Sequence, residues 1–227
     1  MSHLMNLEAL KQELSSLLIS SDRIRTPQGL PSGLIALDGF LETQGLPRGE
    51  MSLLISPPGS GGTSFCLQLL RLNLPDLGYA AWVSSKSHLF APHVARTHLD
   101  LKKILLVRRP EKARSFFWIL EEVLATETFG CVICHLETNP LSNKQFIKLK
   151  RIARQKNICL IFLVSADLLG SIDEFAVVMK FSFRQLLVLR ALHRPTPFLI
   201  EMHPFPQLMV QSRTGDFDGS ALPAPRK

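Results

Sequence analysis

Short apolar runs alternate with amphipathic segments through most of the chain. The apolar runs have the length of strands and cover 51–56, 79–84, 104–107, 130–136 and 158–164. Helix-like segments lie between and around them and cover 34–41, 63–72, 110–125 and 142–155. The strand-like runs do not alternate apolar and polar residues. The pattern therefore predicts an α/β fold with a parallel sheet that helices bury on both faces.

The pattern changes after residue 175. Further strand-like runs, joined by short turns, cover 176–183, 185–192, 197–203 and 207–211. Short connections favour antiparallel pairing, so we expect an antiparallel extension at one edge of the sheet. Residues 212–227 are rich in Gly, Pro, Ser and Asp, and we expect a disordered tail there.

The first segment, 1–21, has the pattern of an amphipathic helix. Leucines recur at steps of three and four residues, at Leu4, Leu7, Leu10, Leu14, Leu17 and Leu18. Two interpretations are open. The leucine face packs on the core of the domain that follows, or Leu7, Leu10 and Leu14 contact a neighbouring subunit or a partner protein.

Composition narrows the class of protein. Of the 227 residues 46% are hydrophobic, which is enough for a buried core and excludes an intrinsically disordered chain. The longest apolar run, Ile158–Val164, is far shorter than the 20 or so residues of a membrane-spanning helix. With four cysteines and no secretory signal pattern, we expect a cytoplasmic protein without a disulfide framework.

Net charge indicates an acidic partner without specifying one. The chain carries 26 basic and 19 acidic residues, a formal charge of +7. Basic residues gather in the predicted helix 142–155, at Lys144, Lys148, Lys150, Arg151 and Arg154. They form either an ordinary solvated helix face or a surface for DNA or an acidic protein.

The most informative local sequence is the turn that follows the predicted strand 51–56. Ser56-Pro57-Pro58-Gly59-Ser60-Gly61-Gly62-Thr63 matches the phosphate-binding pattern G-x-x-x-x-G-K-[ST] at Gly61 and Thr63. Such a loop holds phosphate with consecutive backbone N–H groups at a helix N-terminus. Two positions differ, because Ser56 replaces the first glycine and Gly62 replaces the lysine. Each lost charged hydrogen bond costs roughly 1.5–3 kcal/mol.

The order of these segments resembles the RecA-type ATPases over residues 22–211. The resemblance rests on Leu34-Ile35-Ala36-Leu37-Asp38, on Gly45-Leu46-Pro47-Arg48-Gly49-Glu50, and on the strand and loop that follow. Ala80-Ala81-Trp82-Val83-Ser84 resembles the RecA strand before the catalytic glutamate. The segment 130–135 resembles the strand that carries the magnesium-associated aspartate, and 187–198 resembles the late hairpin. The resemblance implies a three-layer RecA-like core with a mostly parallel sheet and antiparallel edge strands.

The resemblance also implies that the catalytic positions are altered. Gly62 stands for the phosphate-binding lysine, Lys86 for the glutamate that orients water, and His135 for the aspartate. Of this set only the hydroxyl of Thr63 remains. Phosphoryl transfer depends on positioning and charge stabilisation, so we expect a pseudo-ATPase with no cofactor and no metal. In an alternative, Lys86 acts as a displaced phosphate-binding lysine beside Gly59, Ser60, Gly61 and Gly62.

Among RecA relatives with altered loops, a short chain with an N-terminal helix most resembles the ImuA family. This resemblance implies an adaptor in the SOS response and error-prone translesion DNA synthesis. The expected partners are RecA and ImuB, a catalytically inert relative of the Y-family polymerases, with DNA bound through the basic surface as a further option. The expected location is the bacterial cytoplasm, at the nucleoid, with no membrane contact. The alternatives are a SulA-like inhibitor of cell division and a weak ATP-binding protein.

Overall fold

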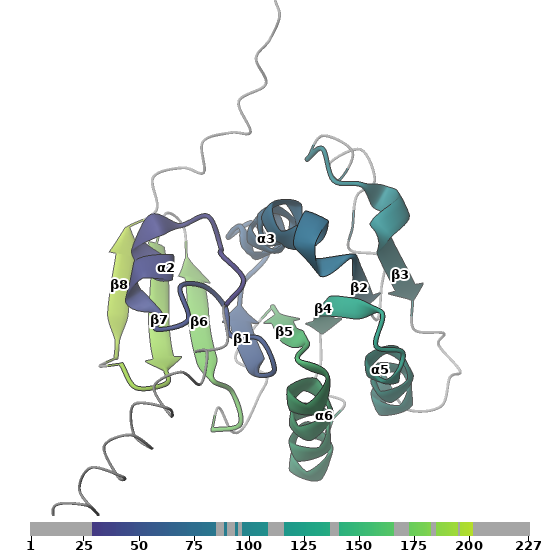
Figure 1. Ribbon diagram of the computed structural model, residues 1–227. Coiled ribbons are helices and arrows are strands. Elements are labelled where there is room, and N and C mark those ends of the chain that lie inside the picture. Colours follow the sequence, from purple (N-terminus) through teal and green to yellow (C-terminus); the bar gives the residue numbers. More distant parts are fainter. Residues whose placement is uncertain are drawn as a thin grey trace, which may run out of the picture.

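Eight strands form one sheet in the order β3-β2-β4-β5-β1-β6-β7-β8 (Figure 1). The computed structural model describes residues 29–84, 89, 94, 97–108, 116–136, 141–165, 173–182, 185–194 and 196–201. In chain order the strands are β1 (Met51–Ile55), β2 (Tyr79–Ser84), β3 (Ile104–Arg108), β4 (Phe129–Leu136), β5 (Cys159–Val164), β6 (Val177–Ser182), β7 (Gln185–Ala191) and β8 (Phe198–Glu201).

The sheet is parallel from β3 to β6 and antiparallel from β6 to β8. The predicted α/β fold class, with a mostly parallel sheet and antiparallel edge strands, is therefore confirmed. The central strands β1 and β5 are buried along their whole length, which explains why their sequences show no alternation of apolar and polar residues.

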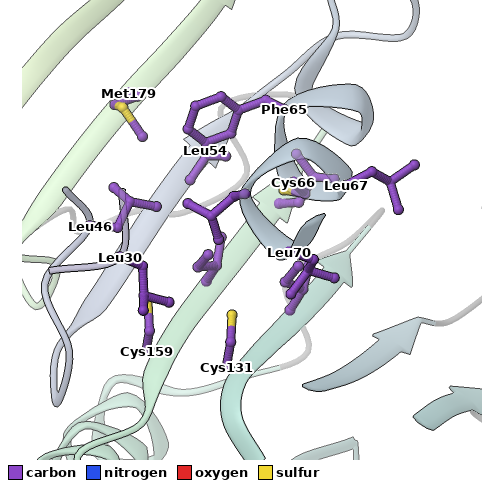
Figure 2. Close-up of a cluster of buried hydrophobic side chains, with 14 of the residues drawn as sticks. Leu30, Leu46, Leu54, Phe65, Cys66, Leu67, Leu70, Cys131, Cys159 and Met179 are labelled. Carbon is purple, nitrogen blue, oxygen red and sulfur yellow. The ribbon is translucent and has the colours of Figure 1, made fainter. Parts of the chain in front are cut away.

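Helices cover both faces of the sheet, as Figure 1 shows. On one face lie α2 (Ile35–Phe40) and α3 (Gly62–Leu77), and on the other lie α5 (Phe116–Ala125) and α6 (Asn143–Lys156). A short 3-10 helix, η1 (Leu101–Lys103), precedes β3. Figure 2 shows part of the apolar layer under α3, where Phe65 packs near Leu54 of β1 and Met179 of β6. The side chains packed between the sheet and the helices are apolar on both faces. Their burial stabilises the sheet and so holds the strand ends in fixed positions.

The element boundaries agree with the sequence pattern within about two residues, with one clear exception. The helix predicted to end at residue 72 continues to Leu77, with Pro75 in its last turn, and then stops at Gly78, where φ is +74°. The described part of the helix predicted over 110–125 is 116–125. The predicted helix 1–21, the strand 207–211 and the tail 212–227 lie outside the described residues. No helix in the described part of the chain is long and apolar enough to span a membrane.

Candidate functional site

The loop between β1 and α3 forms the floor of a pocket of about 420 Å³ at the carboxyl ends of the parallel strands. Gly59 and Gly61 have φ values of +80° and +103°, which lie in the left-handed region that favours glycine. Gly61 directly precedes α3, so the loop leads its backbone into the N-terminus of a sixteen-residue helix. The pocket is lined by Ser56, Pro57, Pro58, Gly59, Gly61, Gly62, Thr63, Ser64, His135, Leu163 and Ser165.

The serine hydroxyls of the loop bind one another and the loop backbone. The Oγ of Ser56 lies 2.7 Å from the Oγ of Ser60, and it accepts the N–H of Gly62 at 3.0 Å. The N–H of Ser60 donates to the carbonyl of Pro57 at 3.0 Å. Thus the structure brings the predicted residues Gly59 to Thr63 together, but the side chain of Ser60 faces Ser56 and is not part of the pocket lining.

Gly62 lies very close to Ser56, the residue that follows β1. A Cβ atom at this position would lie 2.4 Å from Ser56 Cβ and 2.9 Å from Leu163 Cδ1. Such distances are far inside van der Waals contact, so no side chain fits at position 62 while Ser56 is present. The sequence identified Ser56 and Gly62 as two departures from the pattern but did not show that they touch.

The described lining of this pocket carries none of the charged groups of a nucleotide site. Among its described lining residues there is no lysine, arginine, aspartate or glutamate. At the aspartate position stands His135, 9% exposed, whose ring lies edge-on to Trp82 with the ring centroids 6.3 Å apart. Mg²⁺ prefers carboxylate and phosphate oxygens, whereas the described lining offers it only hydroxyls, among them that of Thr63. No group of three potential metal ligands occurs in the described part of the chain. These residues do not fit a magnesium nucleotide.

Several predicted site residues lie outside the described residues. They are Lys86, the candidate displaced phosphate-binding lysine, and Leu7, Leu10 and Leu14 of the candidate partner helix. Their predicted roles stay predictions.

The basic residues of α6 are largely paired with carboxylates of neighbouring elements. Lys148 pairs with Glu121 of α5, Lys150 with Glu174 at 3.9 Å, and Arg154 with Glu50 before β1. In the described part of the chain no carboxylate pairs with the remaining two cations, Lys144 and Arg151, which are exposed. A phosphate backbone would therefore meet mostly neutralised charge on this helix.

Sequence reasoning missed a second pocket, at the amino ends of the strands. It has a volume of about 390 Å³, and its polar lining includes Arg48, Glu50, Arg154 and His193. Arg154 thus contributes to this pocket and to the ion pair with Glu50 rather than only to an outer helix face. The two partners are 104 residues apart in sequence, and no local motif indicates their contact.

Comparison with known proteins identifies the fold. No protein-family model matches the chain, and no curated protein sequence matches it. Among solved structures, the crystal structure of the RadB recombinase aligns with a TM-score of 0.60 and 17% sequence identity. The alignment covers 75% of this chain and 93% of that one. The strand order and this likeness together show that the described chain has a RecA-like core.

Proposed function

We propose that the chain is a non-catalytic RecA-like adaptor in the SOS response and error-prone translesion synthesis. In this role it links RecA with an ImuB-type relative of the Y-family polymerases. One observation carries the proposal: the RecA-like sheet and its loop are retained, while the described lining of the loop pocket holds no charged group. An intact framework without catalytic charges is suited to presenting a surface.

The adaptor role requires a RecA-like shape and no chemistry. The buried strands β1 and β5 hold the helices in place on both faces of the sheet. In the ImuA family, which the sequence resembles, the partners include ImuB and RecA. We propose that the leucine face of segment 1–21 supplies one contact, through Leu7, Leu10 and Leu14.

Co-purification tests the proposal directly. The chain is co-expressed with a tagged ImuB-type protein and with RecA, and we expect it to be retained by either one in stoichiometric amount. The variant L7S/L10S/L14S should lose retention of one partner. A matched variant of the polar face, Q12A/S15A/S16A, should keep it.

Three outcomes would contradict the adaptor role. One is retention of neither partner by the folded full-length chain. A second is inhibition of FtsZ assembly by the purified chain, which would favour the cell-division inhibitor. The third is ATP turnover that depends on Lys86, measured with a Lys86→Ala variant, which would favour a weak nucleotide-hydrolysing enzyme.

A further inference from the structure

We propose that Ser56 and Gly62 form a matched pair that closes the loop between β1 and α3 against polyphosphate. The proposal rests on the non-catalytic interpretation of this loop but not on the identity of any partner. In this proposal the Ser56 side chain keeps the loop in shape when no anion is bound.

An N–H group of the loop has its partner within the loop itself. In a phosphate-binding loop such groups point at the anion, and an empty loop leaves them without partners. Here the Ser56 hydroxyl accepts the N–H of Gly62 at 3.0 Å and contacts the Ser60 hydroxyl at 2.7 Å. Ser56 therefore supplies an oxygen to a group that a phosphate would otherwise satisfy. A polyphosphate has to displace these hydrogen bonds before it binds.

Steric contact also couples the two residues. The two Cβ positions of residues 56 and 62 would be only 2.4 Å apart, so at least one of these residues must be glycine. The Cβ of Ser56 is fixed by the backbone of the strand end and cannot rotate away, unlike the Leu163 methyl 2.9 Å from the same point. A lysine at 62 thus requires a glycine at 56. The two departures from the pattern are one coupled exchange rather than two separate losses.

A double-mutant cycle tests the coupling. The four proteins are the full-length wild type, S56G, G62K and S56G/G62K, each measured for its thermal midpoint and for Mg-ATP binding by calorimetry. Gly39→Lys is the matched control, because a Cβ at Gly39 meets nothing within 4 Å. We expect G62K to lower Tm by roughly 4–8 °C. S56G/G62K should recover most of that loss, and Gly39→Lys should change Tm by less than about 2 °C.

Binding is the second readout. The wild type should show no heat of binding at millimolar Mg-ATP, whereas S56G/G62K should bind at least about tenfold more tightly. If the double variant fails to fold, S56G alone is decisive. It removes the Ser56 hydroxyl that accepts the N–H of Gly62, and it adds no atoms that would have to be accommodated. It must then bind Mg-ATP more tightly than the wild type.

Several results would overturn the proposal. They are micromolar Mg-ATP binding by the wild type, a G62K variant as stable as Gly39→Lys, and additive effects of S56G and G62K on Tm. A stable S56G/G62K variant with no gain in affinity would also overturn it. None of these results bears on retention by RecA or the ImuB-type partner, so failure here leaves the adaptor proposal standing.

Discussion

Cys131 of β4 and Cys159 of β5 are direct register partners in the parallel pair, and both thiols are buried beneath α3 (Figure 2). Cys66 of α3 lies in the same apolar cluster, whereas Cys134 faces the other side of the sheet. The spacing of Cys131 and Cys134 thus places them on opposite faces and makes no metal or redox pair, as the strand period predicts.

The buried thiols should be inert in the folded protein. Burial raises the pKa of Cys66 and Cys134, and a hydrogen bond with Cys159, together with burial, raises that of Cys131. Because the thiolate is the reactive species, we expect no reaction with an aromatic disulfide reagent near pH 7 within minutes. In denaturant all four thiols should react at once. Rapid labelling of one thiol in the native state would contradict this packing.

The same shifts predict a loss of stability in alkali. The ordinary pKa of a cysteine is 9.0, and these groups titrate higher in the folded state. Above about pH 9 the unfolded chain releases thiol protons that the native state keeps, so the free energy of unfolding falls as pH rises. Below that pH the thiols do not make the free energy of unfolding depend on pH. Urea unfolding midpoints at a series of pH values check this, with a Cys134→Ala variant expected to show a shallower alkaline decline.

Three phenylalanines form the centre of the core on the α5–α6 face. Phe146 of α6, Phe162 of β5 and Phe175 before β6 contact one another edge to face, with ring centroids 5.4–5.7 Å apart. Phe162→Ala should cost about 3–5 kcal/mol of unfolding free energy, because the packed sheet and helices cannot move in to fill the cavity. Phe162→Leu should cost less than half as much. Phe117→Ala, at a half-buried site under Lys148, is the control and should cost less than about 2 kcal/mol.

The ion pairs of α6 predict weak binding to DNA. Only Lys144 and Arg151 are exposed cations of this helix without a carboxylate partner in the described structure. The association constant for duplex DNA should therefore fall by about two powers of ten for each tenfold rise in salt concentration, a slope of about two on logarithmic axes. Lys144→Gln with Arg151→Gln should abolish the binding, whereas Lys102→Gln with Lys103→Gln should not. Fluorescence anisotropy measures both. A slope above about five would mean that DNA displaces the carboxylates.

Local sequence predicts the strands of this protein better than it predicts the candidate site. The β5 run is apolar at every position and the β1 run at every position but Ser52, and such a run marks a buried strand wherever it lies in the chain. The end of α3 was predicted five residues early, at residue 72, and the helix continues through Pro75 to Leu77. Proline lacks the N–H that would donate to the carbonyl four residues earlier, yet the helix continues to Leu77, and Gly78, where φ is +74°, follows it.

The candidate site depends on contacts between distant residues, which local patterns do not encode. The altered positions Ser56 and Gly62 were evident from the loop pattern, but their contact depends on the path of the loop in space. Likewise, the basic residues of α6 are evident in the sequence, but their pairing with Glu50 and Glu121 depends on how helices and turns pack. Charge counted along a sequence therefore overstates the free charge on this surface.

His135 allows a final test of whether the pocket binds a metal ion. The imidazole at the end of β4 lies beside Leu163 of β5 and lines the pocket together with Thr63. We expect neither Mg²⁺ nor a chelator to change the Tm of the wild type, because the described lining offers no carboxylate. His135→Asp places a carboxylate at a site only 9% exposed, so it should lower Tm in the wild-type background.

Combined with S56G/G62K, the same substitution should behave differently. The carboxylate then has a bound nucleotide and its magnesium ion to pair with, so His135→Asp should make nucleotide binding depend on Mg²⁺. His135→Asn, which has similar shape and no charge, is the control and should confer no such dependence. Calorimetry with and without Mg²⁺ measures the difference. A Mg²⁺-dependent rise in the Tm of the unaltered chain would contradict the assignment, because it would mean that the protein still holds the ion with its own residues.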